Sequence, residues 1–221
     1  TRRKFGKACC GDVFLSRRSA DGNRLCSVLA DGLGSGLQAN VAASLTGTMA
    51  LEYITADLDL RRAAEMIMDA LPLCPERHIS YSTFTMLRAD TDGTVRLIEY
   101  GNPAALHLRG ATPLPLPREP FTLPRWNGRE MTCATFRAEL HDRIVICSDG
   151  VTQAGLGSDR FPFGWGSGHL ADFIAARLAE APDLSAADLA PELVTHAPGY
   201  DSGIPGDDNT AAVPHYPPPP T

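Results

Sequence analysis

Two apolar runs of this chain end in the same pair of residues, an aspartate followed by a glycine. The first run is LCSVLADG, which ends in Asp31 and Gly32, and the second is IVICSDG, which contains Asp149. Apolar runs of this length are typical of buried strands, and a rigid strand holds an aspartate at its tip in few rotamers. The glycine leaves room for a backbone carbonyl or a ligand to approach closely. The two patterns therefore predict strands that each end in a carboxylate, at a position where another backbone segment or a ligand comes close.

The remaining strand-like runs are short, and several are joined by turn sequences. SADGN joins the runs 12–16 and 25–30, and RADTDGT joins the runs 82–87 and 95–100. These turn sequences predict hairpins and therefore antiparallel pairing. The expected strands cover 12–16, 25–30, 82–87, 95–100, 105–108, 143–147 and 210–213.

Helical periodicity is found between and after these runs. We expect helices over 37–53, 58–71, 167–180 and 185–197. In the first of them an apolar residue recurs every four positions, which predicts a stripe that packs on a sheet. The stripe consists of Leu37, Val41, Leu45, Met49 and Tyr53.

Hairpins flanked by helices indicate an α+β fold in which helices cover antiparallel sheets. The proline-rich stretch 110–124 is expected to form a surface loop within one domain. That domain covers 1–215, and 216–221 form a proline-rich tail that cannot build a core.

The composition excludes some classes of function. The 221 residues carry a formal net charge of −6, with a pI of about 5.5, which argues against a nucleic-acid-binding surface. No run approaches the roughly 20 apolar residues that a membrane span needs. The basic start TRRKFGK is not followed by the apolar core of a signal peptide, so we expect a cytoplasmic protein without membrane contact.

Two further acidic sites share the strand-end context of the first two. Asp12 lies in CGDVF, and Asp207 and Asp208 lie in PGDDNTAAV. Each of the four sites alone is compatible with an ordinary turn, since Asp-Gly is a turn dipeptide. Together they favour a site for hard divalent cations such as Mg²⁺ or Mn²⁺, which prefer oxygen ligands. The run GLGSG also resembles part of a dinucleotide-binding fingerprint, but Leu37 stands where the last glycine belongs, which disfavours a nucleotide.

Six motifs, in this order, resemble those of the metal-dependent protein serine/threonine phosphatases (the PPM family), in the bacterial SpoIIE-like branch. They are GDVF, ADGLGSG, YSTFT, EYGNPAAL, ICSDGV and DDNTA, and they extend from Gly11 to about Val213. The resemblance implies a four-layer α-β-β-α sandwich of two antiparallel sheets flanked by helices. It also implies two Mn²⁺ or Mg²⁺ ions at one edge between the sheets.

The resemblance assigns roles to individual residues. Asp31 would bridge the two ions, the carbonyl of Gly32 would bind one of them, and Asp149 would bind the other. Asp12 would hold a metal-bound water or bind an ion directly. Asp12, Asp31 and Asp149 are thus the expected catalytic residues.

Either Asp207 or Asp208 would complete the metal site, and counting back from Thr210 in the family's D-x-x-T pattern favours Asp207. Two positions depart from the wider family. Leu33 stands where eukaryotic members have a histidine that is proposed as the general acid. Lys7 is nearest to the position of their phosphate-binding arginine.

The implied activity is hydrolysis of phosphoserine or phosphothreonine on a regulatory protein by metal-activated water, without a phosphoenzyme. The substrate class would be a small phosphorylated domain of the anti-sigma antagonist type. Two alternatives stay open: a pseudophosphatase that binds a phosphoprotein without turnover, and a hydrolase of small phosphate esters.

Overall fold

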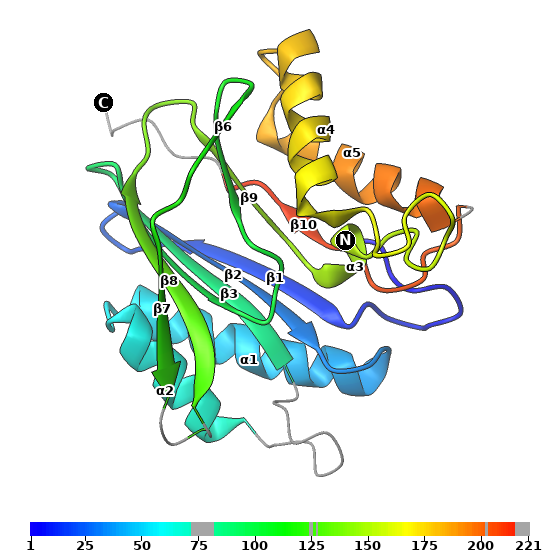
Figure 1. Ribbon diagram of the computed structural model, residues 1–221. Helices are drawn as coiled ribbons and strands as arrows, with labels where there is room; N and C mark the ends of the chain where they lie inside the picture. The colour runs from blue at the N-terminus through cyan, green and yellow to red at the C-terminus, as the bar shows by residue number, and fades with distance from the viewer. Residues whose placement is uncertain (72–81, 124–125, 127, 202, 215–221) are drawn as a thin grey trace.

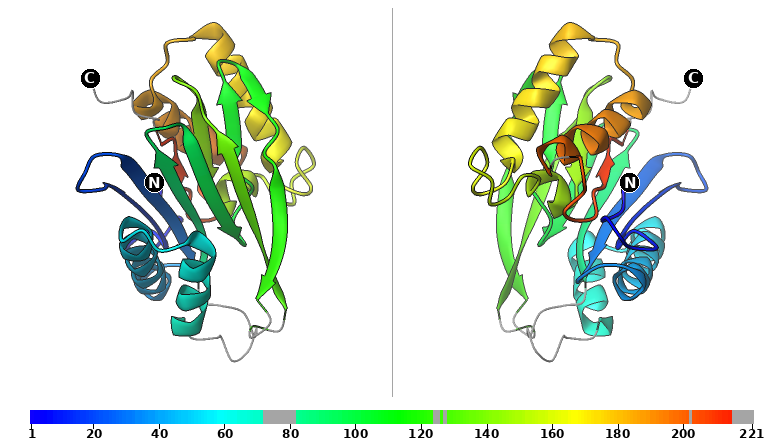
Figure 2. Two further views of the ribbon diagram at one scale, coloured as in Figure 1. Left: turned by 90° about the vertical axis from the view of Figure 1, so that its left-hand side faces the viewer. Right: turned by 90° about the vertical axis from the view of Figure 1, so that its right-hand side faces the viewer.

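The computed structural model describes residues 1–71, 82–123, 126, 128–201 and 203–214 (Figure 1). Two antiparallel sheets lie face to face, and helices cover the outer face of each sheet (Figure 2). This is the expected α+β sandwich with four layers in the order α-β-β-α. The predicted tail 216–221 lies outside the described residues.

The first sheet contains six strands in the order β1-β2-β3-β4-β8-β7. Both predicted hairpins are confirmed, because β1 pairs with β2 and β3 pairs with β4, each antiparallel. The bounds of the strands are β1 Asp12–Arg18, β2 Arg24–Gly32, β3 Ser82–Asp90, β4 Thr94–Tyr100, β7 Arg118–Leu123 and β8 Arg129–Arg137.

The second sheet has the order β10-β9-β5-β6. Its strands are β5 Leu106–Arg109, β6 Thr112–Leu114, β9 Arg143–Cys147 and β10 Ala211–Ala212. Helices α1 Leu37–Thr55 and α2 Leu60–Ala70 cover the first sheet, and α4 Gly166–Glu180 and α5 Ala186–His196 cover the second (Figure 1). A short helix, α3 Asp149–Thr152, follows β9, and a 3-10 helix, Ala197–Asp201, follows α5.

Contrary to expectation, most of the described part of the proline-rich stretch 110–124 is not a loop. It forms β6 and β7, which lie at the edges of the two sheets. Proline is tolerated in an edge strand because its missing N–H is not needed for a neighbour on the open side. Pro113 in β6 and Pro120 in β7 both lie in such edge strands.

The predicted packing face of α1 is right for Met49 and Tyr53, which are partly buried against the core, and wrong for the other three residues. Leu37, Val41 and Leu45 are 72%, 59% and 49% exposed. The face against the sheet consists of small residues with a few larger ones: Ala39, Ala43, Thr46, Gly47, Ala50, Leu51 and Ile54. The helix lies so close to the sheet that a Cβ added at Gly47 would be 3.3 Å from the side chain of Leu15. Large side chains therefore do not fit near Gly47, and Leu37, Val41 and Leu45 lie on the exposed side of the helix.

Three apolar clusters hold the layers together. One lies between α1, α2 and the first sheet and includes Val28 and Ile67, and one lies under α4 and α5 and includes Leu108 and Ile174. The third lies between the two sheets and includes Leu29 of the first sheet and Ile146 of the second, both almost fully buried. Among the helices in the described part of the chain, none combines the length and the apolar character that crossing a bilayer requires.

Candidate metal centre and substrate cleft

The end of the first sheet brings two aspartates together. The register of β1 and β2 places Asp12 opposite Asp31, and the register of β2 and β3 places Asp31 opposite Thr83. Directly opposed residues of antiparallel strands have neighbouring side chains on one face of the sheet. The three side chains therefore form a row across this end of the sheet.

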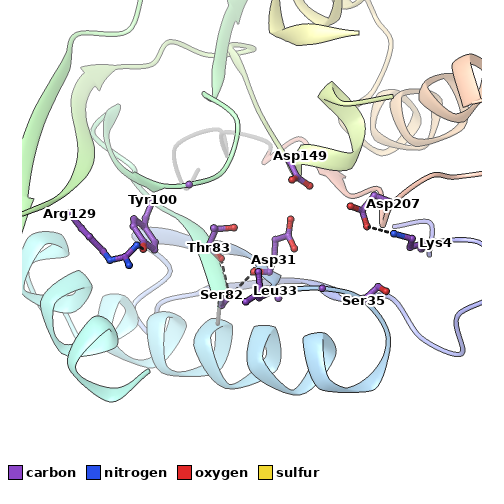
Figure 3. Close-up of a pocket in the computed structure, with 13 residues that line it drawn as sticks. Lys4, Asp31, Leu33, Ser35, Ser82, Thr83, Tyr100, Arg129, Asp149 and Asp207 are labelled. Atoms are coloured by element: carbon purple, nitrogen blue, oxygen red, sulfur yellow. Dashed lines mark hydrogen bonds and ion pairs between the residues drawn. The ribbon is translucent and has the colours of Figure 1, made fainter. Parts of the chain in front are cut away.

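The second sheet supplies two more carboxylates to the same place. Asp149 is the first residue of α3, just after β9, and Asp207 precedes β10, which pairs with β9. Figure 3 shows Asp31, Asp149 and Asp207 pointing into one space between the two sheets. Segments that are far apart in the sequence thus meet at one edge of the sandwich.

This space is an open cleft of about 520 Å³. Its walls include Asp31, Asp149 and Asp207, the glycine-rich loop 32–35 and the first residues of β3. Lys4 lines the cleft beside Asp207, and Tyr100 and Arg129 line the opposite end (Figure 3).

The carboxylates in the cleft raise one another's pKa values. Burial, followed by the nearby charges of Asp12 and Asp149, raises the pKa of Asp31 to about 9. Burial, and then the charge of Asp207, raises the pKa of Asp149 above its usual range. Raised pKa values show that negative charge on these acids is not compensated by nearby positive groups. A bound cation would supply that compensation.

Asp12 lies beside Asp31 on the neighbouring strand, does not line the cleft, and is 4% exposed. Neither of its carboxylate oxygens has a hydrogen-bond partner among the described residues. Burial raises the pKa of Asp12 to about 6, although the nearby hydroxyls of Ser148 and Thr210 act to lower it. A buried carboxylate without a partner is costly unless a cation or a water compensates it.

The two neighbours Asp207 and Asp208 have different environments. Asp207 lies in the cleft with its side chain 39% exposed. Asp208 is 4% exposed, and its carboxylate accepts hydrogen bonds from the backbone amides of Lys4 at 2.7 Å and Gly11 at 2.9 Å. The structure therefore brings Asp207, and not Asp208, to the other cleft carboxylates, while Asp208 fastens the N-terminal segment.

The glycines of the two Asp-Gly pairs are required by close packing. A Cβ on Gly32 would lie 2.0 Å from the carbonyl oxygen of Ala39 in α1. A Cβ on Gly150 would lie 2.0 Å from the carbonyl oxygen of Asp208. Each glycine lets another backbone segment approach the strand end that carries an acid, so the motifs fix the geometry of the site.

Lys7, the expected substrate-binding residue, is exposed and does not line the cleft. Lys4 lines the cleft instead, with its Nζ 3.8 Å from an oxygen of Asp207. The sequence reasoning also missed Tyr100 and Arg129. Tyr100 ends an expected strand and could have been considered, whereas Arg129 belongs to β8, which was not predicted.

In the part of the chain that the structure describes, no three acidic, histidine or cysteine side chains are close enough to form a ready-made metal site. The residues nevertheless fit divalent cations. They offer hard oxygen ligands, the buried oxygens of Asp12 have no partner, and the cluster carries uncompensated charge. Mutual repulsion of carboxylates is expected to hold them apart until a cation draws them together.

Solved structures share this fold. A structure of the PP2C phosphatase domain with a fragment of the regulatory domain of SpoIIE from Bacillus subtilis matches with a TM-score of 0.74 and 18% identity, over 96% of this chain and 59% of that chain. The RsbU and RsbW domains of a Mycobacterium tuberculosis protein match with a TM-score of 0.69 and 19% identity, over 96% and 56% of the two chains. RsbX in complex with magnesium matches with a TM-score of 0.58 and 21% identity, over 96% and 89%.

The fold is thus that of PP2C-type phosphatase domains. The chain spans 59% and 56% of the first two of these structures. Residues 21–216 match the family described as stage II sporulation protein E (SpoIIE), and the chain belongs to this family. No curated protein matches the chain in sequence.

Proposed function

We propose that this protein hydrolyses phosphoserine or phosphothreonine on a regulatory protein, and that it uses two Mn²⁺ or Mg²⁺ ions. The observation that carries the proposal is the meeting of Asp31, Asp149 and Asp207 in one cleft, with the buried carboxylate of Asp12 opposite Asp31 in the sheet. Membership in the SpoIIE family supports the reaction class. The likeness to RsbX, which was solved with magnesium, supports a divalent cation.

Bound divalent cations would lower the pKa of water and polarise a phosphoryl oxygen. Asp31, Asp149 and Asp207 would hold them together with the carbonyl of Gly32, and Asp12 would hold a cation or a water next to Asp31. Lys4 would contact the phosphoryl group as a point charge. Leu33 cannot donate a proton, so water in the cleft would protonate the leaving oxygen.

The partner would be a small phosphorylated regulatory domain of the anti-sigma antagonist type. Support comes from the matching Mycobacterium tuberculosis structure, which contains RsbU and RsbW domains. An open cleft between two sheets is accessible to a serine on a protein surface, which an enclosed pocket would exclude.

The test is phosphate release by the purified protein from a phosphoserine peptide and from p-nitrophenyl phosphate, with Mn²⁺, with Mg²⁺ and with EDTA. We expect metal-dependent turnover that favours the peptide, and a loss of at least about 100-fold in Asp31→Asn. Asp92→Asn is the matched control, because Asp92 is exposed in the β3–β4 turn.

The two alternatives predict other results. Turnover of the small ester alone would indicate a hydrolase of small phosphate esters. Metal-independent binding of a phosphopeptide without any phosphate release would indicate a pseudophosphatase and would contradict the proposed activity.

A further inference from the structure

Asp149 and Asp207 belong to two chain segments that strand pairing joins on one side. β10 pairs with β9, and next to this pair the amide of Ser148 donates a hydrogen bond to the carbonyl of Thr210 at 2.9 Å. Both aspartates lie beyond these bonds, where the strands have ended. Burial, followed by the charge of Asp207, raises the pKa of Asp149, so the two carboxylates repel each other. This repulsion acts to separate the two segments at the candidate metal site.

Asp201 joins the same two segments on the other side. It is the last residue of the 3-10 helix that follows α5, and it is partly buried. Its Oδ1 accepts a hydrogen bond from the amide of Gly155 at 2.6 Å, and its Oδ2 accepts one from the amide of Gly206 at 3.4 Å. Gly155 follows shortly after Asp149, and Gly206 directly precedes Asp207. One carboxylate therefore connects the backbone near both cleft aspartates.

The hydrogen bond from Gly155 is supported by close packing. Gly155 has a φ of 73°, in the left-handed region that glycine tolerates. A Cβ on Gly155 would lie 3.1 Å from the Cβ of Tyr200, the neighbour of Asp201, and 3.2 Å from the ring of Phe161. The Gly155 segment thus packs directly against the end of the 3-10 helix, which keeps its amide within reach of Asp201.

Gln153 contacts the carboxylate of Asp149 directly. Its Nε2 donates a hydrogen bond to Asp149 Oδ2 at 3.0 Å, and its backbone amide donates one to the Asp149 carbonyl at 2.7 Å. Gln153, Asp201 and Asp207 also line one hollow of about 300 Å³. Gln153 therefore restrains the side chain of Asp149, while Asp201 restrains the backbone near both aspartates. Hydrogen bonds of this kind orient carboxylates that bind a metal.

We propose that Asp201 is a positioning residue for the metal site, and that with Gln153 it makes the site select small divalent cations. This inference rests on the proposed function and deepens it by naming residues that determine which cation binds. Mg²⁺ requires nearly ideal octahedral geometry at about 2.0–2.1 Å, whereas Ca²⁺ accepts irregular geometry at about 2.3–2.6 Å. Carboxylates that cannot move apart freely favour Mg²⁺, and carboxylates that can move apart also accommodate Ca²⁺.

The test is isothermal titration of the metal-free protein with Mg²⁺ and with Ca²⁺, and the readout is the ratio of Kd for Ca²⁺ to Kd for Mg²⁺. Asp201→Ala should weaken Mg²⁺ binding about 10-fold, as expected when a residue that supports a metal ligand is lost. It should weaken Ca²⁺ binding much less, so the ratio falls. Gln153→Met, which keeps the length of the side chain but removes the donor, should lower the ratio in the same direction.

Two further variants separate positioning from a general effect on the fold. Asp201→Asn retains an oxygen that can accept the Gly155 amide, so it should keep most of the wild-type ratio. Asp142→Ala is the matched control, because Asp142 also accepts a backbone amide, that of Glu139 at 2.8 Å, but precedes β9 at the end away from Asp149. It should lower the stability in urea and leave the ratio unchanged.

The proposal is overturned if Asp201→Ala keeps the wild-type ratio, or if Asp142→Ala lowers the ratio equally. Its failure is distinguishable from failure of the proposed activity. If wild type binds Mg²⁺ but releases no phosphate from any phosphopeptide, the activity is refuted, and the titrations still decide the role of Asp201. If wild type binds neither cation, the proposed metal site is refuted and this inference fails with it.

Discussion

Asp12 and Asp31 are direct cross-strand partners on β1 and β2, so two carboxylates share one end of the sheet. Like charges opposite each other destabilise a pair of strands. Burial and the neighbouring acids raise the pKa of Asp31 to about 9, and Asp12 has no hydrogen-bond partner among the described residues. The folded state without a cation therefore carries an electrostatic strain that a cation would relieve.

The first prediction concerns the metal-free protein. The pKa of Asp31 is near 3.9 in the unfolded chain and about 9 in the folded one. The folded state thus keeps a proton that the unfolded state releases, so stability in EDTA should fall as the pH rises from about 4 to about 9. Asp31→Asn should flatten this dependence and raise the free energy of unfolding at pH 7 by about 1–3 kcal/mol.

Urea unfolding at pH 5, 7 and 9 in EDTA measures both effects. With excess Mg²⁺ the order should reverse, because only wild type gains stability from binding. A variant that is less stable than wild type in EDTA at pH 7 would contradict the prediction.

The second prediction concerns the first Asp-Gly pair. Gly32→Ala places a Cβ 2.0 Å from the Ala39 carbonyl oxygen, so α1 or the glycine-rich loop must move. We expect a loss of about 1–3 kcal/mol in the free energy of unfolding. Gly168→Ala in α4 is the control, because nothing lies within 4 Å of its added Cβ, and it should gain about 0.5–1 kcal/mol. Chemical denaturation of both variants measures the difference, and similar values would refute the packing argument.

How much of this site could be predicted from the sequence depends on how local its determinants are. The hairpins follow from turn residues between apolar runs, and the strand ends that carry Asp31 and Asp149 follow from the same runs. The buried face of α1 could not be predicted in this way, because close approach to the sheet selects Ala43 and Gly47 over the larger Leu37 and Leu45. Hydrophobic periodicity finds the helix but assumes that its largest residues point inward.

The far end of the cleft depends on tertiary pairing. Arg129 contacts Tyr100 only because β8 pairs with β4. The strand β8 was not predicted, because it follows a proline-rich stretch that was interpreted as a surface loop. The same limit applies to Lys4. Its position is fixed by a hydrogen bond from its backbone amide to the carboxylate of Asp208, which lies more than 200 positions away in the sequence. Nothing in the neighbouring sequence indicates either contact.

The third prediction separates Asp207 from Asp208. Asp207→Asn should weaken Mg²⁺ or Mn²⁺ binding about 10- to 100-fold, with little change in stability, since its side chain is partly exposed. Asp208→Asn should instead lower stability by about 1–3 kcal/mol, because the amides of Lys4 and Gly11 lose a charged acceptor. Isothermal titration with each metal and urea unfolding in EDTA provide the two readouts. If Asp208→Asn loses metal binding while keeping full stability, the two roles are exchanged.

The fourth prediction concerns a buried acid far from the cleft. Asp142 is 1% exposed and accepts hydrogen bonds from Arg109 Nε at 3.0 Å and from the Glu139 amide at 2.8 Å, with His107 Nε2 at 2.8 Å. Burial raises the pKa of Asp142, but the bonds from Arg109, the Glu139 amide and His107 outweigh it, and the pKa lies below its usual range.

A lowered pKa contributes stability that is present above the unfolded pKa of about 3.9 and is lost as the pH falls through the folded pKa. Asp142→Asn should therefore cost about 2 kcal/mol at pH 7, a value reduced from that of a fully buried pair because the Arg109 side chain is 43% exposed. The cost should shrink below pH 4, where wild type loses the same charge. Asp172→Asn on the exposed side of α4 is the control and should change stability by less than about 0.5 kcal/mol. Urea unfolding from pH 3 to 7 measures the curve, and a cost that is constant with pH would show that packing, and not the carboxylate charge, maintains this cluster.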